Sequence, residues 1–464
     1  MSALILYNAR LVDKDRDGPG ALLVENGQIV AVCDGDCKNP ELLFGDRAQN
    51  ARTFDVQGCA LMPSFIDLHT HFRDPGFTYK EDIDSACQAA VAGGFGTVVC
   101  MANTNPVVSD TQAAFSVRQR AEKLGLLRLF QAVSATEGFD GKSTDHLDAL
   151  DPCSVPLVSE DGKEVASARV MRDVMKKCAE KGVVLSCHCE DPDLADEAKE
   201  YRTRALEADA QDMESFFIDR GELSNDRRPK SGVLCSVPNS VSGPLAEAEH
   251  ILRLAEDLMT GRNLTLAEET GCKVHFAHVS TSGALSLIRS AKLKNSQGAS
   301  KVSCEVTPHH LSLTRDCVAI VNPPLRTEKD RLSLIEGLCD GTIDAIASDH
   351  APHSLEDKQK GAPGFSGIQA VFPVCYTALV SNKRISLSRL SALLSANPAS
   401  ILGIQAGLIG PGYPADLVVV NTEGETLFEG QSWYSKSINS PYLGHRYAGQ
   451  VVATFYQGKM VFAQ

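Results

Sequence analysis

The sequence lacks an excess of positive charge. Its 45 Lys and Arg residues stand against 59 Asp and Glu residues, which gives a formal net charge of -14 and a pI near 5.4. Nucleic acids and anionic membrane surfaces attract proteins that carry a concentrated positive field, so this composition argues against both kinds of partner. A small molecule is the better expectation for a ligand, and an anionic one would need positive charge gathered locally at its site.

Long hydrophobic runs are also missing. No apolar stretch reaches the roughly 18 residues that a membrane-spanning helix requires, and the N-terminus lacks the basic and apolar regions typical of a signal peptide. These features predict a cytoplasmic protein that does not bind membranes. Its 464 residues, 43% of them hydrophobic, are enough for one large domain and a smaller one.

Disulfide pairing has little support, although cysteine is plentiful. The fifteen cysteines are an odd number scattered over a long chain, and many lie inside apolar runs such as TVVCMAN and VSCEVT. We expect them to be reduced and buried. Cys187 and Cys189 flank His188, but on a strand both would face away from whatever the histidine faces.

Both ends of the chain have the pattern of β-strands. The first 60 residues contain ALILYNARLV and ALLVENGQIVAV, the second broken by an Asn-Gly turn signal, and the last 50 or so contain ADLVVVNTEG and QVVATFYQGKMVFA. We therefore predict that residues 1–60 and 408–464 together form one small β-sandwich domain. The middle of the chain, residues 61–407, would be a second domain.

Between the two ends, short apolar runs alternate with segments of helical composition. Alternating strands and helices predict a parallel sheet, and eight strands predict an α/β fold of the (β/α)8 TIM-barrel type. The gap from about residue 193 to 271 is too long for one helix and should contain an insertion. The eight runs are ALMPSFIDLHTH, GTVVCMANT, LRLFQAVSAT, SVPLVSEDG, GVVLSCHCED, KVHFAHVST, KVSCEVTPHH and DAIASDHAPH.

The runs end in polar residues, and in such a barrel the C-terminal ends of the strands build the active site. Four histidines and two carboxylates are a suitable ligand set for two divalent metal ions of the zinc type, and one carboxylate can bridge both ions. A single histidine at a strand end is more often solvated than a metal ligand. Four histidines and two aspartates at the ends of five strands nevertheless favour a metal site. The polar strand-end residues are His69, His71, Asn103, Asp161, His188, His278 and Asp349.

Two further histidine patterns refine this prediction. His69 and His71 place both imidazoles on one side of a strand, because side chains alternate with a period of two. His275 begins its run rather than ending it, so we expect a structural role for it.

These runs also resemble a known family. The segments DLHTHFRDPG, MANTNP, SEDG, HCED, HVSTSGAL, EVTPHHL, NPPLR and SDHAPH are similar, in order, to the signature segments of the dihydroorotases. That family belongs to the amidohydrolase superfamily, with the hydantoinases and allantoinases. The similarity runs from about residue 58 to 410, and the terminal β segments resemble the small domain of the family.

The resemblance implies an activity and a site. It implies a zinc-dependent hydrolase that reversibly converts the cyclic amide of (S)-dihydroorotate into N-carbamoyl-L-aspartate in de novo pyrimidine (UMP) biosynthesis. One zinc ion would be held by His69, His71, Asp161 and Asp349, and a second by Asp161, His188 and His278. The resemblance also implies substrate contacts by His71, with Arg73, Asn103 and His353 at the carboxylate and Asn322 at the ring.

Elementary chemistry supports two of these roles. Arg73 lies two residues beyond His71, so it projects to the same side if the strand continues, and a guanidinium is the best partner for a planar carboxylate. Breaking the C–N bond requires a proton on the departing nitrogen, so a carboxylate must carry one there. Asp349, a terminal ligand rather than the bridging one, is our choice for this catalytic group.

The main alternative is another cyclic amidohydrolase of the hydantoinase or allantoinase type. Many superfamily members place a lysine, as a bridging carbamate, in the segment aligned with SEDG. This chain has Asp161 there, which favours a dihydroorotase in which aspartate bridges directly. A single tightly held zinc ion, with Asp161 in no bridging role, stays open.

A non-catalytic relative that serves a transcarbamoylase is a weaker alternative, because all six ligand positions are filled. An active enzyme could equally form a homodimer or assemble with aspartate transcarbamoylase. Three features depart from the family pattern. Ser64 stands where a glycine is usual, Gln369 stands where an acidic residue is common, and the insertion containing DRRPKSG is long.

Overall fold

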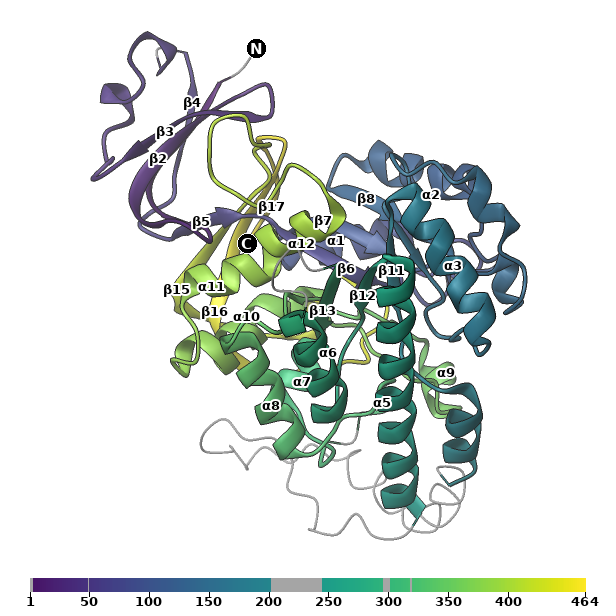
Figure 1. Cartoon of the computed structure of the whole chain (residues 1–464). Helices are drawn as coiled ribbons and strands as arrows, with labels where there is room; N and C mark the ends of the chain where they lie inside the picture. The colour runs from purple at the N-terminus through teal and green to yellow at the C-terminus, as the bar shows by residue number, and fades with distance from the viewer. Residues whose placement is uncertain (1–2, 49, 202–243, 295–300, 318) are drawn as a thin grey trace, which may run out of the picture.

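A computed structural model describes residues 3–48, 50–201, 244–294, 301–317 and 319–464 (Figure 1). The segment DRRPKSG, residues 226–232, lies outside the described residues. All cysteines in the described ranges are free thiols, as the sequence predicted, but Cys153 and Cys339 are exposed rather than buried. None of the helices in these ranges is long and apolar enough to cross a membrane.

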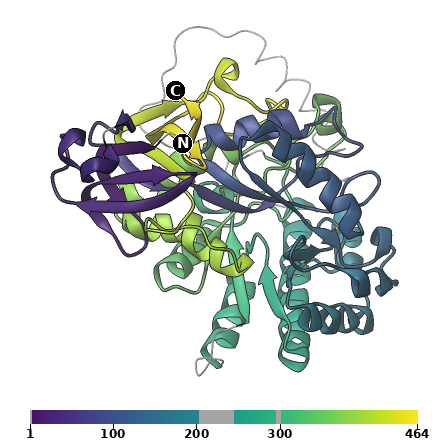
Figure 2. The ribbon, with the colours of Figure 1, turned by 90° about the horizontal axis from the view of Figure 1, so that it is seen from above.

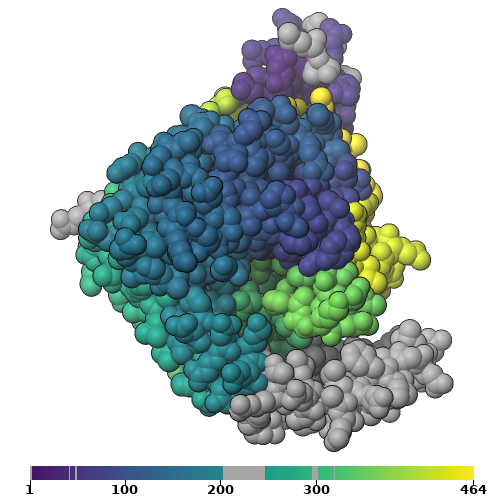
Figure 3. Space-filling model, turned by 90° about the vertical axis from the view of Figure 1, so that its right-hand side faces the viewer, coloured from purple at the N-terminus to yellow at the C-terminus, as the bar shows by residue number. Residues whose placement is uncertain are grey.

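Both ends of the chain contribute to one mixed sheet. Its strand order is β17-β16-β15-β5-β1-β2-β3, with β4 paired to β1. The purple N-terminal and yellow C-terminal strands therefore lie side by side (Figure 2), and the N-terminal strands protrude from the rest of the molecule (Figure 3). The strands are β1 (Leu4–Val12), β2 (Asp17–Glu25), β3 (Gln28–Asp34), β4 (Arg52–Asp55), β5 (Ala60–Pro63), β15 (Leu417–Leu427), β16 (Arg446–Tyr456) and β17 (Lys459–Ala463).

This sheet has its own hydrophobic core. Leu6, Leu22 and Leu417 belong to one buried cluster, although they come from strands β1, β2 and β15. Phe54 of β4 and Phe455 of β16 meet edge to face with ring centroids 5.2 Å apart, and their strands are not hydrogen-bonded neighbours. Residues from both ends of the chain therefore share one buried cluster.

The middle of the chain forms parallel strands in two groups. The three-stranded group has the order β6-β7-β8, and the six-stranded group has the order β14-β13-β12-β11-β10-β9. Only Ala132 separates β8 from β9, so the two groups follow one another along the chain. The strands are β6 (Phe65–Thr70), β7 (Phe95–Cys100), β8 (Arg128–Gln131), β9 (Val133–Ser134), β10 (Leu157–Ser159), β11 (Val184–Cys187), β12 (Lys273–Phe276), β13 (Val302–Val306) and β14 (Ala345–Ile346).

Each of the eight apolar runs contains at least one of these parallel strands, but the first run is divided. Its first half is β5, which pairs with β1 and β15, and its second half is β6, which pairs with β7. Ser64 stands at the junction and donates its N–H to the carbonyl of Asp416 at 2.9 Å. The sequence pattern predicts one strand for this run, whereas the chain passes from one sheet to the other at Ser64.

Helices connect successive parallel strands and lie outside them (Figure 1). The segments EVASARVMRDVMKKCAEKG and LRTEKDRLSLIEGLCDG, predicted to be helical, contain α3 and α8, with Ser167 and Thr327 as N-caps. The helices are α1 (Ile83–Ala92), α2 (Thr111–Leu124), α3 (Ala168–Lys181), α5 (Pro244–Thr270), α6 (Ser282–Lys294), α7 (Pro308–Ser312), α8 (Glu328–Cys339), α9 (Leu355–Gln359), α10 (Val371–Cys375), α11 (Leu387–Ser391) and α12 (Asn397–Leu402), with π-helical turns at Tyr376–Ser381 and Ala392–Ala396.

A buried ion pair fixes the turn that follows β12. Glu256 of α5 accepts hydrogen bonds from the backbone N–H groups of Ser280 (2.8 Å) and Thr281 (3.0 Å), and its Oε2 lies 3.1 Å from Nη2 of Arg326. Burial alone would raise the pKa of Glu256, but Arg326 and these hydrogen bonds outweigh it and lower the pKa. The pair therefore holds α5, the turn after β12 and the segment before α8 together.

We expect Arg326→Leu to lower the free energy of unfolding by about 3–5 kcal/mol, because it leaves the Glu256 charge buried without its partner. Denaturant unfolding followed by circular dichroism measures this change. Arg315→Leu is the matched control, since Arg315 pairs with Glu249 of the same helix at 2.9 Å but its side chain is 40% exposed. The control should cost less than about 1 kcal/mol. Equal effects of the two substitutions would contradict this account.

Candidate metal centre

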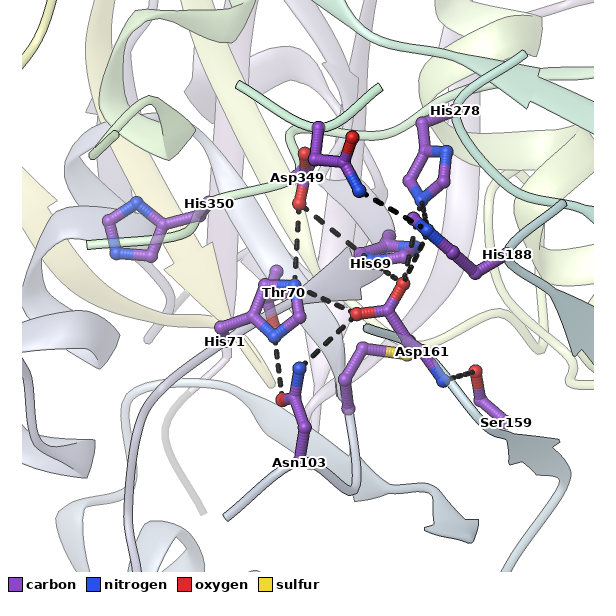
Figure 4. Close-up of polar contacts among 12 residues, drawn as sticks. His69, Thr70, His71, Asn103, Ser159, Asp161, His188, His278, Asp349 and His350 are labelled. Atoms are coloured by element: carbon purple, nitrogen blue, oxygen red, sulfur yellow. Dashed lines mark hydrogen bonds and ion pairs between the residues drawn. The ribbon is translucent and has the colours of Figure 1, made fainter. Parts of the chain in front are cut away.

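The ends of five strands deliver six buried side chains to one place (Figure 4). His69 lies in β6 and His71 directly after it, while Asp161 follows β10. The other three side chains come from residues that follow β11, β12 and β14, namely His188, His278 and Asp349. All six side chains are buried: His69, His71, Asp161, His188, His278 and Asp349.

Asp161 is at the centre of this cluster. Its Oδ1 lies 3.3 Å from Nε2 of His69, 3.5 Å from Nδ1 of His188 and 3.4 Å from Nε2 of His278. Its Oδ2 lies 3.4 Å from Nε2 of His71. Both carboxylate oxygens therefore face ligand nitrogens, and they face different ones.

Asp349 approaches the cluster from one side. Its Oδ1 lies 3.3 Å from Nε2 of His71 and 3.7 Å from Nε2 of His69. Asp349 and His278 have positive φ values of 46° and 34°, in the left-handed region that is costly for residues other than glycine. The backbone at both strand ends is therefore turned so that these side chains reach the cluster.

The ligand atoms fall into two compact groups, and the atoms within each group lie within 4.8 Å of one another. One group is His69, Asp161 and His278, and the other is His69, His71 and Asp349. His188 adjoins the first group, because its Nδ1 lies 3.0 Å from Nε2 of His278. Imidazole nitrogen and carboxylate oxygen are the donors that zinc and similar divalent ions prefer, so the residues present fit a metal centre.

The charges of the cluster favour a cation. Burial lowers the pKa of His69, but Asp161, Glu305 and Asp349 outweigh it and raise the pKa well above its usual value. Burial raises the pKa of Asp161, but His69, His188 and His278 lower it well below its usual value. Neither ring nitrogen of His69 makes a hydrogen bond. Such a negative, incompletely hydrogen-bonded pocket would stabilise a divalent cation.

A further carboxylate supports His69 from the opposite side of its ring. Oε1 of Glu305, in β13, lies 3.4 Å from Nδ1 of His69, and Oε2 lies 3.0 Å from Nε2 of His275. Burial raises the pKa of Glu305, but the two histidines outweigh it and lower the pKa to about 2. His275 thus contacts the support of a candidate ligand, which agrees with the structural role expected for it.

Asn103 fixes the tautomer of His71. Oδ1 of Asn103 lies 2.8 Å from Nδ1 of His71, and the amide Nδ2 donates to Oδ2 of Asp161 at 3.3 Å. Since an amide oxygen can only accept, Nδ1 of His71 carries the proton and Nε2 is left free to bind a cation. Asn103 therefore orients two candidate ligands.

A group of basic side chains lies beside the cluster. Nη2 of Arg73 is 3.1 Å from Nε2 of His353, and Nζ of Lys80 is 3.4 Å from Nδ1 of the same ring. Burial, with Arg73 and Lys80 nearby, lowers the pKa of His353 to about 3, so the ring is neutral at pH 7. Burial lowers the pKa of Arg73 to about 10, so the guanidinium keeps its charge.

The route by which Arg73 reaches this group differs from the expected one. The spacing from His71 predicts Arg73 on a continuing strand, but β6 ends at Thr70 and Arg73 has a φ of 60°. A residue in this conformation lies in a turn, where the alternation of a strand no longer applies. The Nε of Arg73 donates to the carbonyl of Pro352 at 3.1 Å, which ties the turn to the segment after Asp349.

Asn322 and Glu190 border the cluster next to His188. Nδ2 of Asn322 donates to Oε2 of Glu190 at 3.0 Å and lies 3.5 Å from Nε2 of His188. Oε2 of Glu190 lies 3.5 Å from the same ring nitrogen. Sequence reasoning missed Glu190. Strand β11 ends at Cys187, and the N–H of Glu190 donates to the carbonyl of His188 in a turn, so the period of a strand could not have indicated it.

Asp161 faces the histidines of the cluster, whereas the preceding residue, Glu160, does not. Glu160 turns away and accepts hydrogen bonds from the N–H of Thr136 at 2.9 Å and from the hydroxyl of the same residue. Burial raises the pKa of Glu160 to about 7. Successive residues after β10 thus face opposite sides, and only Asp161 faces the histidines.

Comparison with known proteins places this site in a family. The model of the amidohydrolase family matches residues 60–461. A dihydroorotase from Clostridium botulinum is 35% identical over 461 residues, which cover 99% of both chains. A dihydroorotase from Caldanaerobacter subterraneus is 37% identical over 95% of this chain and 96% of the relative. The chain belongs to the amidohydrolase family, among its dihydroorotases.

Solved structures give the fold of the amidohydrolase family independently. The L-hydantoinase of Arthrobacter aurescens superposes with a TM-score of 0.80 at 22% identity, covering 99% of this chain and 96% of that one. A D-hydantoinase gives a TM-score of 0.77 at 19% identity. Amidohydrolases of this family depend on metal ions, and the described residues hold two groups that could bind them.

Proposed function

We propose that this chain is a zinc-dependent dihydroorotase that interconverts (S)-dihydroorotate and N-carbamoyl-L-aspartate in de novo pyrimidine synthesis. The observation that carries the proposal is a half-buried, charged Arg73 next to the histidine and carboxylate cluster. Dihydroorotate carries a carboxylate that a guanidinium can bind, whereas hydantoin and allantoin carry none. The full-length similarity to dihydroorotases supports the same substrate.

In this proposal, Asp161 would be a ligand of two zinc ions. His69, His71 and Asp349 would complete one site, and His188 and His278 the other, which the central position of Asp161 supports. When bound, a pair of such ions activates water at neutral pH and polarises the amide carbonyl. Asn103 and Glu305 would keep the ligand rings of His71 and His69 in the orientation that binding needs.

The residues of the chain would then bind the substrate and move one proton. Oδ2 of Asp349 would accept the proton of the attacking water and deliver it to the departing ring nitrogen, since its Oδ1 already faces His69 and His71. Arg73 and the neutral ring of His353 would bind the substrate's carboxylate, with His71 and Asn103 beside it. Asn322 would contact the ring.

The architecture in the proposal is a closed (β/α)8 barrel with a small β-sandwich. The parallel bridge between Thr70 and His350 supports closure, because it links the end of β6 to the segment after β14. The contact of Phe54 with Phe455 supports two facing layers in the terminal sheet. We keep residues 1–60 with 408–464 and residues 61–407 as the two domains, except that residues 61–63, which belong to β5, pair with the sheet of the smaller one. A homodimer, or an assembly with aspartate transcarbamoylase, and a cytoplasmic location stay predictions from the sequence.

The catalytic role of Asp349 is tested by Asp349→Ala. We expect turnover of dihydroorotate to fall at least about 100-fold while the circular dichroism spectrum is unchanged, because proton transfer at the departing nitrogen is lost. Asp145→Ala is the control, since the Asp145 side chain is 99% exposed. Near-normal turnover by Asp349→Ala in a zinc-replete sample would remove Asp349 from the mechanism.

The substrate is tested by Arg73→Met with dihydroorotate, hydantoin and allantoin as a panel. We expect the wild type to prefer dihydroorotate, and the variant to lose about 10-fold to 100-fold in kcat/KM for dihydroorotate only, because a charged hydrogen bond to the carboxylate is lost. Arg118→Met on α2 is the matched control. Equal losses for dihydroorotate and hydantoin would exclude the role of Arg73 in binding the carboxylate, and a wild-type preference for hydantoin would favour the hydantoinase alternative.

A further inference from the structure

Strand β13 also ends near the cluster, but it supplies no ligand to the proposed site. Its end carries His309 and His310 in the first turn of α7. His309 is 1% exposed, and neither of its ring nitrogens makes a hydrogen bond within the described part of the chain. A buried imidazole without partners is costly, so a hydrogen-bonding group from outside the chain is the natural way to satisfy it.

His310, its neighbour, is fully satisfied. Its Nδ1 lies 2.7 Å from the hydroxyl of Thr307, and its Nε2 lies 3.2 Å and 3.3 Å from the carbonyls of Pro323 and Pro324. Carbonyl oxygens only accept, so Nε2 carries the proton. His310 therefore fastens the segment after Asn322 against α7, which is a structural task that His309 does not share.

His309 lies close enough to the metal cluster for the charges of the cluster to act on its ring. Its ring meets Phe365 edge to face at 5.1 Å between centroids, and His310 packs against it at 4.5 Å. Burial and His310 lower the pKa of His309 well below its usual value, and the further charges that act on it are those of Asp349, His278 and His69. The ring is therefore neutral, with one N–H donor and one acceptor nitrogen.

Asn322 has a second unpartnered atom in the same region. Its Nδ2 is used by Glu190, but its Oδ1 is buried without a hydrogen bond. The segment that carries Asn322 is held against α7 by His310. The donor and acceptor atoms of His309 and Asn322 are thus uncharged, unlike the basic group around Arg73, which suits a different part of the substrate.

We propose that His309 is a substrate-binding residue that donates a hydrogen bond to the ureide carbonyl of the ring, while Oδ1 of Asn322 accepts a ring N–H. This inference rests on the proposed function. In dihydroorotate, the carboxylate suits Arg73 and the scissile carbonyl belongs at the metal cluster. The remaining polar groups are the uncharged ureide C=O and its N–H groups, which match a neutral imidazole and an amide oxygen in charge and in hydrogen-bonding capacity.

The test compares wild type with His309→Phe and His309→Gln. The phenylalanine keeps an aromatic ring against Phe365 but has no hydrogen-bonding atoms, whereas glutamine restores a donor. We expect His309→Phe to raise KM for dihydroorotate about 10-fold and to change kcat less than about 3-fold, and His309→Gln to recover most of the affinity. Zinc content and thermal melting should be unchanged, and His146→Phe, which alters a half-buried histidine outside the site, is the control.

A second measurement probes the contact itself. The 2-thio analogue of dihydroorotate replaces the ureide oxygen with a weak acceptor, and its inhibition constant against dihydroorotate is measured for each protein. Wild type should bind the analogue about 10-fold more weakly than dihydroorotate, and His309→Phe should bind the two alike. If His309→Phe does not fold, the same comparison in His309→Leu decides, because leucine also lacks hydrogen-bonding atoms, and equal binding of the two compounds is expected. Unchanged KM and unchanged discrimination in the folded variant without a hydrogen-bonding side chain would overturn the inference, whereas a wild type inactive on dihydroorotate would overturn the proposed function instead.

Discussion

The buried carboxylate of Asp161 is the group on which the rest of the site depends. A carboxylate that is 4% exposed is strongly destabilised unless charged or hydrogen-bonding partners surround it. Its partners are four histidines, which come from β6 and from the ends of β11 and β12. Three strands far apart in the sequence must therefore be in register before this charge can be tolerated, which links assembly of the site to folding of the sheet.

Contacts behind the candidate ligands maintain this arrangement. Asn103 holds His71 in one tautomer, Glu305 faces the far nitrogen of His69, and Glu256 with Arg326 fixes the turn after β12 that follows His278. Each contact uses a buried polar group with partners from another element. The scaffold thus holds the candidate ligands in place, which would reduce the cost of organising a metal site there.

The sequence could predict the parts that depend on local pattern. Apolar runs located the parallel strands, and polar residues at their ends identified the six candidate ligands and Asn103. It could not predict features that depend on distant pairing. The break at Ser64 depends on the carbonyl of Asp416, and the support of His69 depends on Glu305, a residue in the middle of an apolar strand. The turn at Arg73 depends on a left-handed backbone that strand periodicity does not indicate.

We propose above all that Asp161 is a ligand of two metal ions. Anomalous scattering at the zinc absorption edge, from crystals of the full chain grown with zinc, tests it directly. We predict two peaks about 3.5–4 Å apart, one on each side of the Asp161 carboxylate. A single peak next to His69, His71 and Asp349, with no second ion near His188 and His278 at saturating zinc, would contradict the account.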